Sequence, residues 1–288
     1  MPLLSFLSGG DAGINSLLEC YLILMTATAL LCFFAGELTG NYSQVDKLWS
    51  LLPAGYGLLT IFHYQSPRIW LMLILVSAWG LRLSYNFYRK GGYSLIPWKG
   101  DEDYRWKVLR DNPFLKGRLR WGLFNFLFIS LYQNFLIMVF STPFIFAAKY
   151  AGQSLNLIDM AAALLMLSFL LLETISDNQL YRFHTLKKKG VVDDEKYSDS
   201  LRAGFMKDGF WKHVRHPNFI AEQAIWISFY LFSVASSGIM LNWTISGSVL
   251  LVLLFAGSSE FTEKISSGKY PGYESYRKTV PRFIPRIF

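Results

Sequence analysis

The sequence predicts an all-α fold, a polytopic bundle of membrane-spanning helices that forms a single integral membrane domain over residues 1–288. Composition supports this prediction, because 52% of the residues are hydrophobic and only 17% are charged, whereas a typical soluble domain has about 25% charged residues. Long apolar segments recur along the whole chain, and the basic residues are concentrated between them. Such a chain is built to face lipid.

Seven apolar segments meet or approach the length of a membrane-spanning helix, about 17 to 25 residues. The second is short and contains Pro53, Gly55 and Gly57, which predicts a kinked or broken helix. Only Gly238 and its neighbours separate the last two, which predicts a tight helical hairpin or one long bent segment. The segments are Leu17–Ala35, Leu48–Phe62, Ile69–Asn86, Trp121–Ala148, Leu155–Ser176, Asn218–Ser237 and Ile239–Ser259.

The basic residues predict the orientation of this bundle. If all seven segments cross, 25 of the 28 Lys and Arg residues fall on one side. Because the cytoplasmic side carries the positive excess, the N-terminus is predicted outside and the C-terminus in the cytoplasm. A bacterial inner membrane and an endoplasmic reticulum membrane both fit this pattern.

Several classes of function are disfavoured by the same sequence. The net charge of +8 is explained by membrane topology, so we predict no nucleic-acid partner, and no obligate protein partner is evident. Cys20 and Cys32 lie in the first apolar segment and predict neither a disulfide framework nor a metal site. The histidines are too scattered to predict a metal site; they are His63, His184, His213 and His216.

The segment that enters the sixth apolar helix is the most informative one. Pro217 suits the first turn of a helix, and Arg215 and His216 stand just before it. A helix N-terminus beside a cation and an imidazole favours a phosphate or carboxylate ligand. The alternative is that these residues only mark the cytoplasmic edge of the helix.

Acidic residues stand near the predicted cytoplasmic ends of three helices. Glu222 and Trp226 are four residues apart, with Asn218 one turn back, so the three share a helix face. A carboxylate inside a membrane segment is costly and predicts a wet cavity or a functional site, although a structural hydrogen bond between helices is the alternative. The other acidic residues of this kind are Glu173, Asp177, Glu260 and Glu263.

Two further groups are candidates. Arg82 is the basic residue deepest in an apolar segment, and Tyr85 and Asn86, at i+3 and i+4, are expected on its face; snorkelling to the interface also accounts for it. In the tail, Tyr273 and Tyr276 form a stacking face or sit at the membrane interface as aromatic anchors.

These residues carry a resemblance to a known family. Arg215-His216-Pro217-Asn218-Phe219 with Glu222 and Trp226 follows Asp177, Gln179 and Phe183 and precedes the Tyr273–Pro285 tail, and this pattern resembles the C-terminal domain of the steroid 5-alpha-reductase family, over residues 177–288. More closely, residues 40–288 resemble membrane proteins of unknown function grouped beside that family, including the stretches Asp46-Lys47-Leu48-Trp49 and Asp103-Tyr104-Arg105-Trp106. The superfamily also contains sterol reductases and isoprenylcysteine and phospholipid methyltransferases.

The resemblance implies an NADPH-dependent oxidoreductase that reduces a carbon–carbon double bond in a membrane-dissolved lipid, such as a steroid, sterol or enone-like compound. It places Asp177 and Asn218 at the nicotinamide nucleotide, and Arg82, Arg182 and Arg215 at the phosphates. The implied cofactor-binding set is Arg82, Asp177, Arg182, Arg215, His216, Asn218, Glu222, Trp226, Glu263, Tyr273, Tyr276 and Arg277.

The catalytic acid departs from the family pattern. Trp79 stands where the steroid enzymes have a catalytic Tyr, and Tyr85 and Asp46 are the replacements expected from proximity. Two alternatives stay open: an S-adenosylmethionine-dependent lipid or prenylcysteine methyltransferase, favoured by Glu260 and Glu263 but lacking an adjacent Glu-Glu pair, and a non-catalytic lipid-binding scaffold.

Overall fold

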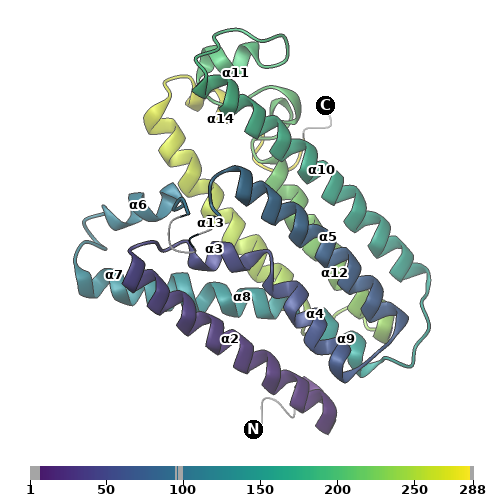
Figure 1. The fold of residues 1–288 in the computed structure, drawn as a ribbon. Coiled ribbons are helices and arrows are strands. Elements are labelled where there is room, and N and C mark those ends of the chain that lie inside the picture. Colours follow the sequence, from purple (N-terminus) through teal and green to yellow (C-terminus); the bar gives the residue numbers. More distant parts are fainter. Residues whose placement is uncertain (1–6, 95, 97–99, 286–288) are drawn as a thin grey trace. The chain divides into compact units, whose positions relative to one another are not determined.

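The computed structural model describes residues 7–94, 96 and 100–285, and in this part of the chain the regular structure is entirely helical. The prediction of an all-helical fold is therefore confirmed (Figure 1). The helices are α2 (Ala12–Thr39), α3 (Gln44–Trp49), α4 (Leu52–His63), α5 (Pro67–Arg89), α6 (Tyr104–Arg110), α7 (Arg118–Phe124), η1 (Asn125–Tyr132), α8 (Gln133–Phe140), α9 (Pro143–Lys149), α10 (Leu157–Lys188), α11 (Ser198–Ala203), η2 (Gly209–Lys212), α12 (Pro217–Ser237), α13 (Ile245–Lys269) and α14 (Tyr273–Thr279).

The chain divides into two compact units. The first unit comprises Met1–Ala163 and Ser228–Leu250, and the second comprises Leu164–Ile227 and Leu251–Phe288. Three long helices, α10, α12 and α13, each pass from one unit into the other.

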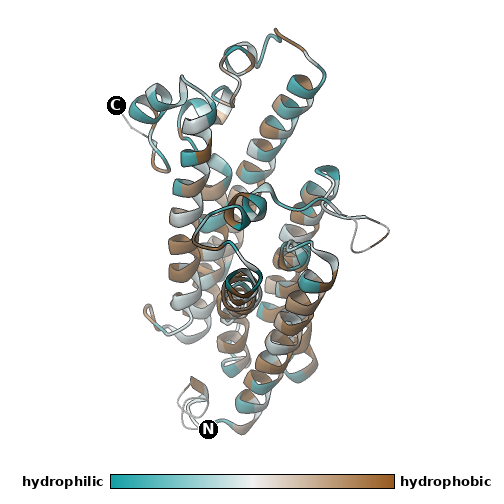
Figure 2. Ribbon diagram, turned by 90° about the vertical axis from the view of Figure 1, so that its left-hand side faces the viewer, coloured by the Kyte–Doolittle hydropathy of each residue, from teal (hydrophilic) through white to brown (hydrophobic). Residues whose placement is uncertain are grey.

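Six helical stretches of the described chain are long and apolar enough to cross a membrane. Figure 2 shows hydrophobic residues along these stretches, with hydrophilic residues gathered in the connecting segments. An integral membrane protein is therefore supported. The stretches are Ala12–Thr39, Pro67–Arg89, Arg118–Lys149, Leu157–Lys188, Pro217–Ser237 and Ile245–Lys269.

The second of the seven predicted segments is not among these six stretches. The seventh begins at Ile245, six residues later than predicted, so residues 238–244 separate α12 from α13. The structure divides the second segment into α3 and α4, with a turn at Ser50 and Leu51, and α4 has only 12 residues. At about 1.5 Å per residue, α4 is about 18 Å long and does not by itself cover a hydrocarbon core of about 30 Å. Pro53 stands at the start of α4, where its missing N–H is tolerated, so the break that the prolines and glycines predict lies just before it.

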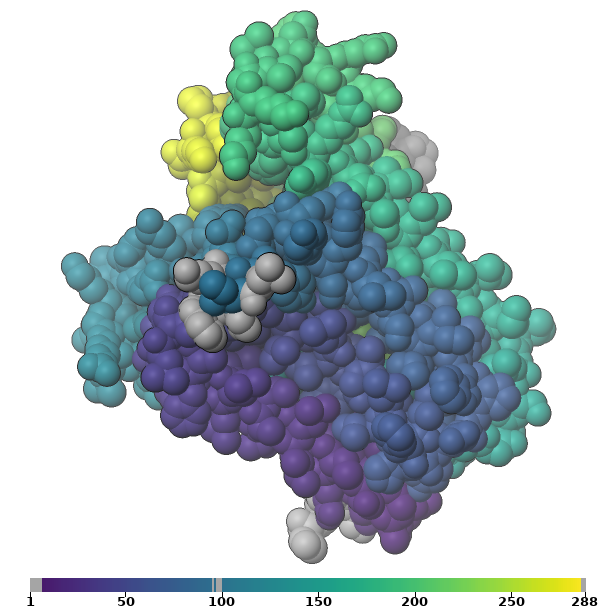
Figure 3. Space-filling model, in the orientation of Figure 1, coloured from purple at the N-terminus to yellow at the C-terminus, as the bar shows by residue number. Residues whose placement is uncertain are grey.

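Local sequence explains the ends of the two long N-terminal helices. Asp11 caps α2 by accepting hydrogen bonds from the amides of Gly13 and Ile14, and Gly40 ends it with a φ of 68°. Ser66 caps α5 and Pro67 follows as the first helical residue. In the first unit α2 packs on α4, η1 and α8, and α4 packs on α5. Figure 3 shows the side chains of α2, α4 and α5, in purple and blue, on the visible face of this unit.

One end of the first unit is held by a buried ion pair. Arg68, at the start of α5, donates through Nε to Asp159 Oδ1 at 2.7 Å and through Nη2 to Oδ2 at 2.9 Å. The same guanidinium donates to the carbonyls of Gln153 and Ser154. The first turns of α5 and α10 therefore lie at one end of this unit.

The second unit has two small aromatic cores. Phe183, Tyr197, Met206 and Trp211 form the first. Phe205, Tyr273 and Tyr276 form the second, which joins the segment after α11 to α14. These cores position the segment between α11 and α12 and the C-terminal tail, which carry the candidate site residues Arg215, His216, Tyr273, Tyr276 and Arg277.

Candidate functional site

The entry to α12 is fastened to the C-terminal tail. Pro217 is the first residue of α12, as the sequence predicts. The amides of Arg215 and His216 donate to the carbonyls of Pro281 and Arg282, at 2.9 and 3.2 Å. This pairing places the side chains of Arg215 and His216 beside the C-terminal half of α13.

Glu263 of α13 is the centre of the site. Its side chain has no exposed surface, and Arg215 contacts it through Nε at 2.8 Å and Nη2 at 3.2 Å. His216 Nε2 lies 2.9 Å from Oε1. Arg277 Nε and Arg282 Nη2 lie 3.2 and 3.1 Å from Oε2. A buried carboxylate that contacts several guanidinium donors is stable as an ion, because the burial is offset by charge-assisted hydrogen bonds.

Two further carboxylates complete the charge balance of this Glu263 cluster. Glu260 pairs with Arg282, and Glu274 lies 3.0 Å from Arg277. Three guanidinium groups thus face three carboxylates. Arg277 and Arg282 are each 28% exposed, and Glu260 and Glu274 are 41% and 53% exposed. An anionic ligand therefore has access to the cluster from the side of these four residues, by competing with the two exposed carboxylates.

Asn218 links α12 to α10. Its Nδ2 donates to Asp177 Oδ1 at 3.2 Å. Its Oδ1 is buried and accepts no hydrogen bond from the described residues. One turn further along, Trp226 Nε1 donates to Glu222 Oε1 at 3.1 Å, which places these two side chains on one helix face, as predicted.

The tail tyrosines are structural in this arrangement. Tyr273 and Tyr276 are buried against Phe205, and the Tyr276 hydroxyl donates to the carbonyl of Trp211. Burial raises the pKa of Tyr273 to about 12 and raises that of Tyr276 as well. Their rings lie 5.6 Å apart, and the choice between a stacking face and interfacial anchors stays a prediction.

Two further predicted phosphate contacts are Arg182 and Arg82. Arg182 is 58% exposed, lies 3.8 Å from Asp194 and faces the ring of Tyr197. Its role as a phosphate ligand stays a prediction. Arg82 lies on α5, in the first unit.

The two candidates for the catalytic acid also lie in the first unit. Tyr85 is 62% exposed and carries the Arg89 guanidinium over its ring. Asn86 is buried and accepts from Arg89 Nε at 2.9 Å, so Arg89 contacts both Tyr85 and Asn86.

Asp46 has a more constrained environment. Trp106 Nε1 donates to Asp46 Oδ2 at 3.0 Å, and Ser43 accepts from the Asp103 amide at 2.9 Å. The structure thus joins the two stretches that begin at Asp46 and Asp103, which sequence reasoning noted but did not bring together. Burial, followed by the negative charge of Asp103, raises the pKa of Asp46. Burial alone would raise the pKa of Asp103 too, but Arg105, 2.8 Å away, lowers it overall.

Sequence reasoning missed several parts of these sites. Arg282 and Trp106 were not among the candidates, and Glu263 was one of twelve cofactor residues, not the centre. The acidic pair at the end of α13 and the basic tail were the available signals, because opposite charges near a membrane surface are expected to pair. The spacing of these residues along the chain did not indicate that the Glu263 carboxylate contacts three arginines.

Comparison with known proteins places this geometry in a family. Residues 32–280 match a family described as "Protein of unknown function (DUF1295)". An uncharacterized protein of Schizosaccharomyces pombe is 37% identical over 262 residues, which are 86% of this chain and 74% of the yeast protein. No solved structure matches. With a match that spans both units and includes Asp46, Asn218 and Glu263, the chain belongs to the DUF1295 family.

Proposed function

We propose that the protein is an NADPH-dependent reductase of a carbon–carbon double bond in a membrane-dissolved lipid. The proposal rests on the resemblance of residues 177–288 to the steroid reductases. The observation that carries it is the buried, unpartnered Oδ1 of Asn218 at the start of α12, with its Nδ2 held by Asp177. A buried polar atom without a partner is costly in a native protein. A ligand with an N–H donor, such as a carboxamide, would supply the missing hydrogen bond to Asn218 Oδ1.

The residues around Asn218 fit a dinucleotide in two respects. The amide of Asn218 is oriented by Asp177, so its acceptor atom has a fixed direction. Among the described residues Arg282 donates through Nη2 alone, which leaves Nε and Nη1 for phosphate oxygens. Guanidinium groups suit phosphate because they donate in a planar fork. When bound, NADPH supplies the hydride; the protein supplies binding, orientation and electrostatics.

Asp46 is the better candidate for the catalytic acid. A carboxyl group whose pKa is raised keeps its proton toward neutral pH and can donate a hydrogen bond. In the proposed reaction, a protonated Asp46 would donate a hydrogen bond to the carbonyl oxygen of an enone and stabilise the enolate that forms on reduction. Water would then supply the proton at the α-carbon, so that one hydride and one proton saturate the double bond. Trp106 orients Asp46. Tyr85, whose side chain is 62% exposed, is the second candidate.

We propose that the chain crosses the membrane seven times. A Cβ on Gly13 would lie 2.2 Å from the hydroxyl of Tyr64, so the start of α2 lies beside the turn between α4 and α5. If α2 and α5 both begin at the same end of the first unit, the chain between Gly40 and Tyr64 must return across the membrane. Residues 48–63 make this crossing despite the short α4. The N-terminus is then outside and the C-terminus cytoplasmic.

Binding of NADPH to the purified full chain tests the function. We expect NADPH to raise the melting temperature of the protein and S-adenosylmethionine to leave it unchanged. Asn218→Ala should abolish the NADPH effect, whereas Asn112→Ala, which removes an amide from the loop after α6, should keep it. Circular dichroism of both variants controls for folding.

Other ligand responses would support one of the two alternative functions. Stabilisation by S-adenosylmethionine alone would favour the methyltransferase. No response to either compound, with Asn218→Ala behaving as the parent protein, would favour the lipid-binding scaffold.

A further inference from the structure

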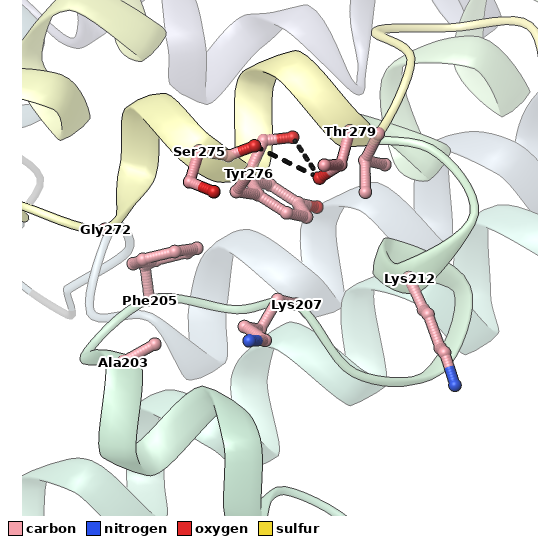
Figure 4. A pocket seen from close by; sticks show the side chains of 9 residues that line it. Ala203, Phe205, Lys207, Lys212, Gly272, Ser275, Tyr276 and Thr279 are labelled. Carbon is pink, nitrogen blue, oxygen red and sulfur yellow. Dashed lines mark hydrogen bonds between the residues drawn. The ribbon is translucent and has the colours of Figure 1, made fainter.

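The second unit has a pocket that the proposed reaction does not use. It has a volume of about 250 Å³ and lies between the segment after α11 and the helix α14 (Figure 4). Phe205 and Tyr276 contribute aromatic rings, and Lys207, Lys212, Ser275 and Thr279 contribute polar groups. None of the side chains of the Glu263 cluster lines it.

The lining has the charge of an anion-binding site. It contains two lysines and no Asp or Glu. Lys207 is half-buried, and neither its ammonium group nor that of Lys212 forms an ion pair or hydrogen bond with a described residue. Figure 4 shows Lys207 folded along the pocket, while the Lys212 ammonium extends outward. Lys207 is therefore the principal cationic group.

The hydroxyl groups of Thr279 and Ser275 differ in whether their protons are already hydrogen-bonded. Thr279 donates to the carbonyls of Ser275 and Tyr276 at 3.1 and 3.3 Å, so its proton is engaged. The Ser275 hydroxyl makes no such bond and remains a donor for a ligand. An ammonium and a hydroxyl that both donate suit the oxygens of a phosphate group.

The walls of the pocket are fixed without a ligand. Ser200 Oγ accepts from the amides of Lys207 and Asp208, at 2.9 and 3.1 Å. Tyr276 ties α14 to the carbonyl of Trp211 through its hydroxyl. Because both walls are hydrogen-bonded to their own surroundings, binding would not have to order them first.

We propose that this pocket binds a phosphate-bearing ligand, with Lys207 as its charge partner and Ser275 as its hydroxyl donor. The phosphate belongs either to an anionic lipid headgroup or to a soluble phosphate compound. The site is independent of the reductase proposal, because Asn218, Asp177 and the Glu263 cluster take no part in it.

Two probes on the full-length protein test the site and separate the sources. Inorganic pyrophosphate, titrated calorimetrically against the detergent-purified protein, represents the soluble source. Melting temperatures in phosphatidylcholine nanodiscs with and without phosphatidic acid represent the lipid source. Lys207→Gln should weaken binding of the probe that responds by about tenfold or more, because a hydrogen bond to a charged group contributes about 1.5–3 kcal/mol. Ser275→Ala should weaken it by a smaller factor.

Lys189→Gln is the matched control, because it removes the same charge from an exposed position outside the pocket. Unchanged binding in this control, with a loss in Lys207→Gln, supports the site with whichever probe responds. Equal losses in the two lysine variants would indicate general surface electrostatics and overturn the proposal. Absence of any response to both probes in the parent protein would overturn it too.

Discussion

Glu263 is the residue on which the structure of the second unit depends most. A carboxylate without exposed surface is costly unless its charge is neutralised, and here Arg215, Arg277 and Arg282 neutralise it. These three arginines come from the entry to α12 and from the tail. Glu263 therefore joins α13 to two segments that have few other polar links to it.

Replacing Glu263 tests this role. Glu263→Gln removes the charge and leaves the buried Arg215 unpaired, which should destabilise the protein by about 3 kcal/mol. Pulse proteolysis in detergent measures the change. Glu274→Gln is the control, since Glu274 is exposed and pairs with Arg277 alone; it should leave the melting temperature almost unchanged. Similar losses in the two variants would show that burial of Glu263 is not the cause.

Asp46 predicts a dependence of stability on pH. Its pKa is raised in the folded protein, so the folded state holds this proton after the unfolded state has lost it. The stabilisation is complete below the ordinary Asp pKa and is lost as pH rises through the raised value. Asp103 acts in the opposite sense, because its lowered pKa gives stability that is lost as pH falls.

The Asp46→Asn variant isolates the first contribution. We expect the loss of stability above the ordinary Asp pKa to become shallower in this variant, because the amide does not titrate. Thermal unfolding across a series of pH values measures it, with Asp111→Asn at an exposed loop position as the control. An unaltered pH profile in Asp46→Asn would mean that the pKa of Asp46 is the same in the folded and unfolded protein.

At the scale of elements, two features depart from regular α-helix packing. The stretch from Arg118 to Lys149 is interrupted by the π-helix η1. Asn125, at the start of η1, donates to Glu37 at 2.8 Å, and Asn134, in the first turn of α8, donates to the Ser130 carbonyl at 2.7 Å. Both amide side chains thus hydrogen-bond inside the unit, as amides do within a membrane bundle. Gly247 of α13 allows the second feature, a close approach to α8.

Gly247 has no room for a larger side chain. A Cβ there would lie 2.4 Å from the Cα of Phe140 and 2.7 Å from the carbonyl oxygen of Val139. Since both are backbone atoms, Gly247→Ala must separate α13 from α8, at a cost of about 1–3 kcal/mol. Gly257→Ala, on the same helix, meets nothing within 4 Å and should be neutral or slightly stabilising. Thermal unfolding of the two variants gives the comparison; equal stabilities would exclude close packing at Gly247.

At the scale of the whole molecule, the proposed topology has one crossing more than the long apolar helices supply. Six helical stretches of the described chain have sufficient length, and we propose the short α4 with the turn before it as the seventh crossing. Arg68 binds the carbonyls of Gln153 and Ser154, so the turn before α5 and the loop before α10 share one end of the first unit. The seven-crossing topology places that end outside.

Single cysteines test this topology in a protein whose Cys20 and Cys32 are replaced by Ser. A membrane-impermeant maleimide should label Gln65→Cys and Gln153→Cys in intact cells or sealed vesicles of known orientation. Lys189→Cys should react only after permeabilisation. Labelling of Gln65→Cys only after permeabilisation would show that residues 48–63 do not cross the membrane.

The sequence by itself determined the helical class, the membrane location and the approximate position of six spans, because apolar length and basic flanks are local properties of the chain. It also drew attention to Arg215, Asn218 and Glu263. Tertiary structure decided which side chains meet: Glu263 with three arginines, Asp46 with Trp106, and Arg182 with Asp194. These pairings depend on how segments distant in sequence fold back on one another, and neither hydropathy nor spacing specifies that.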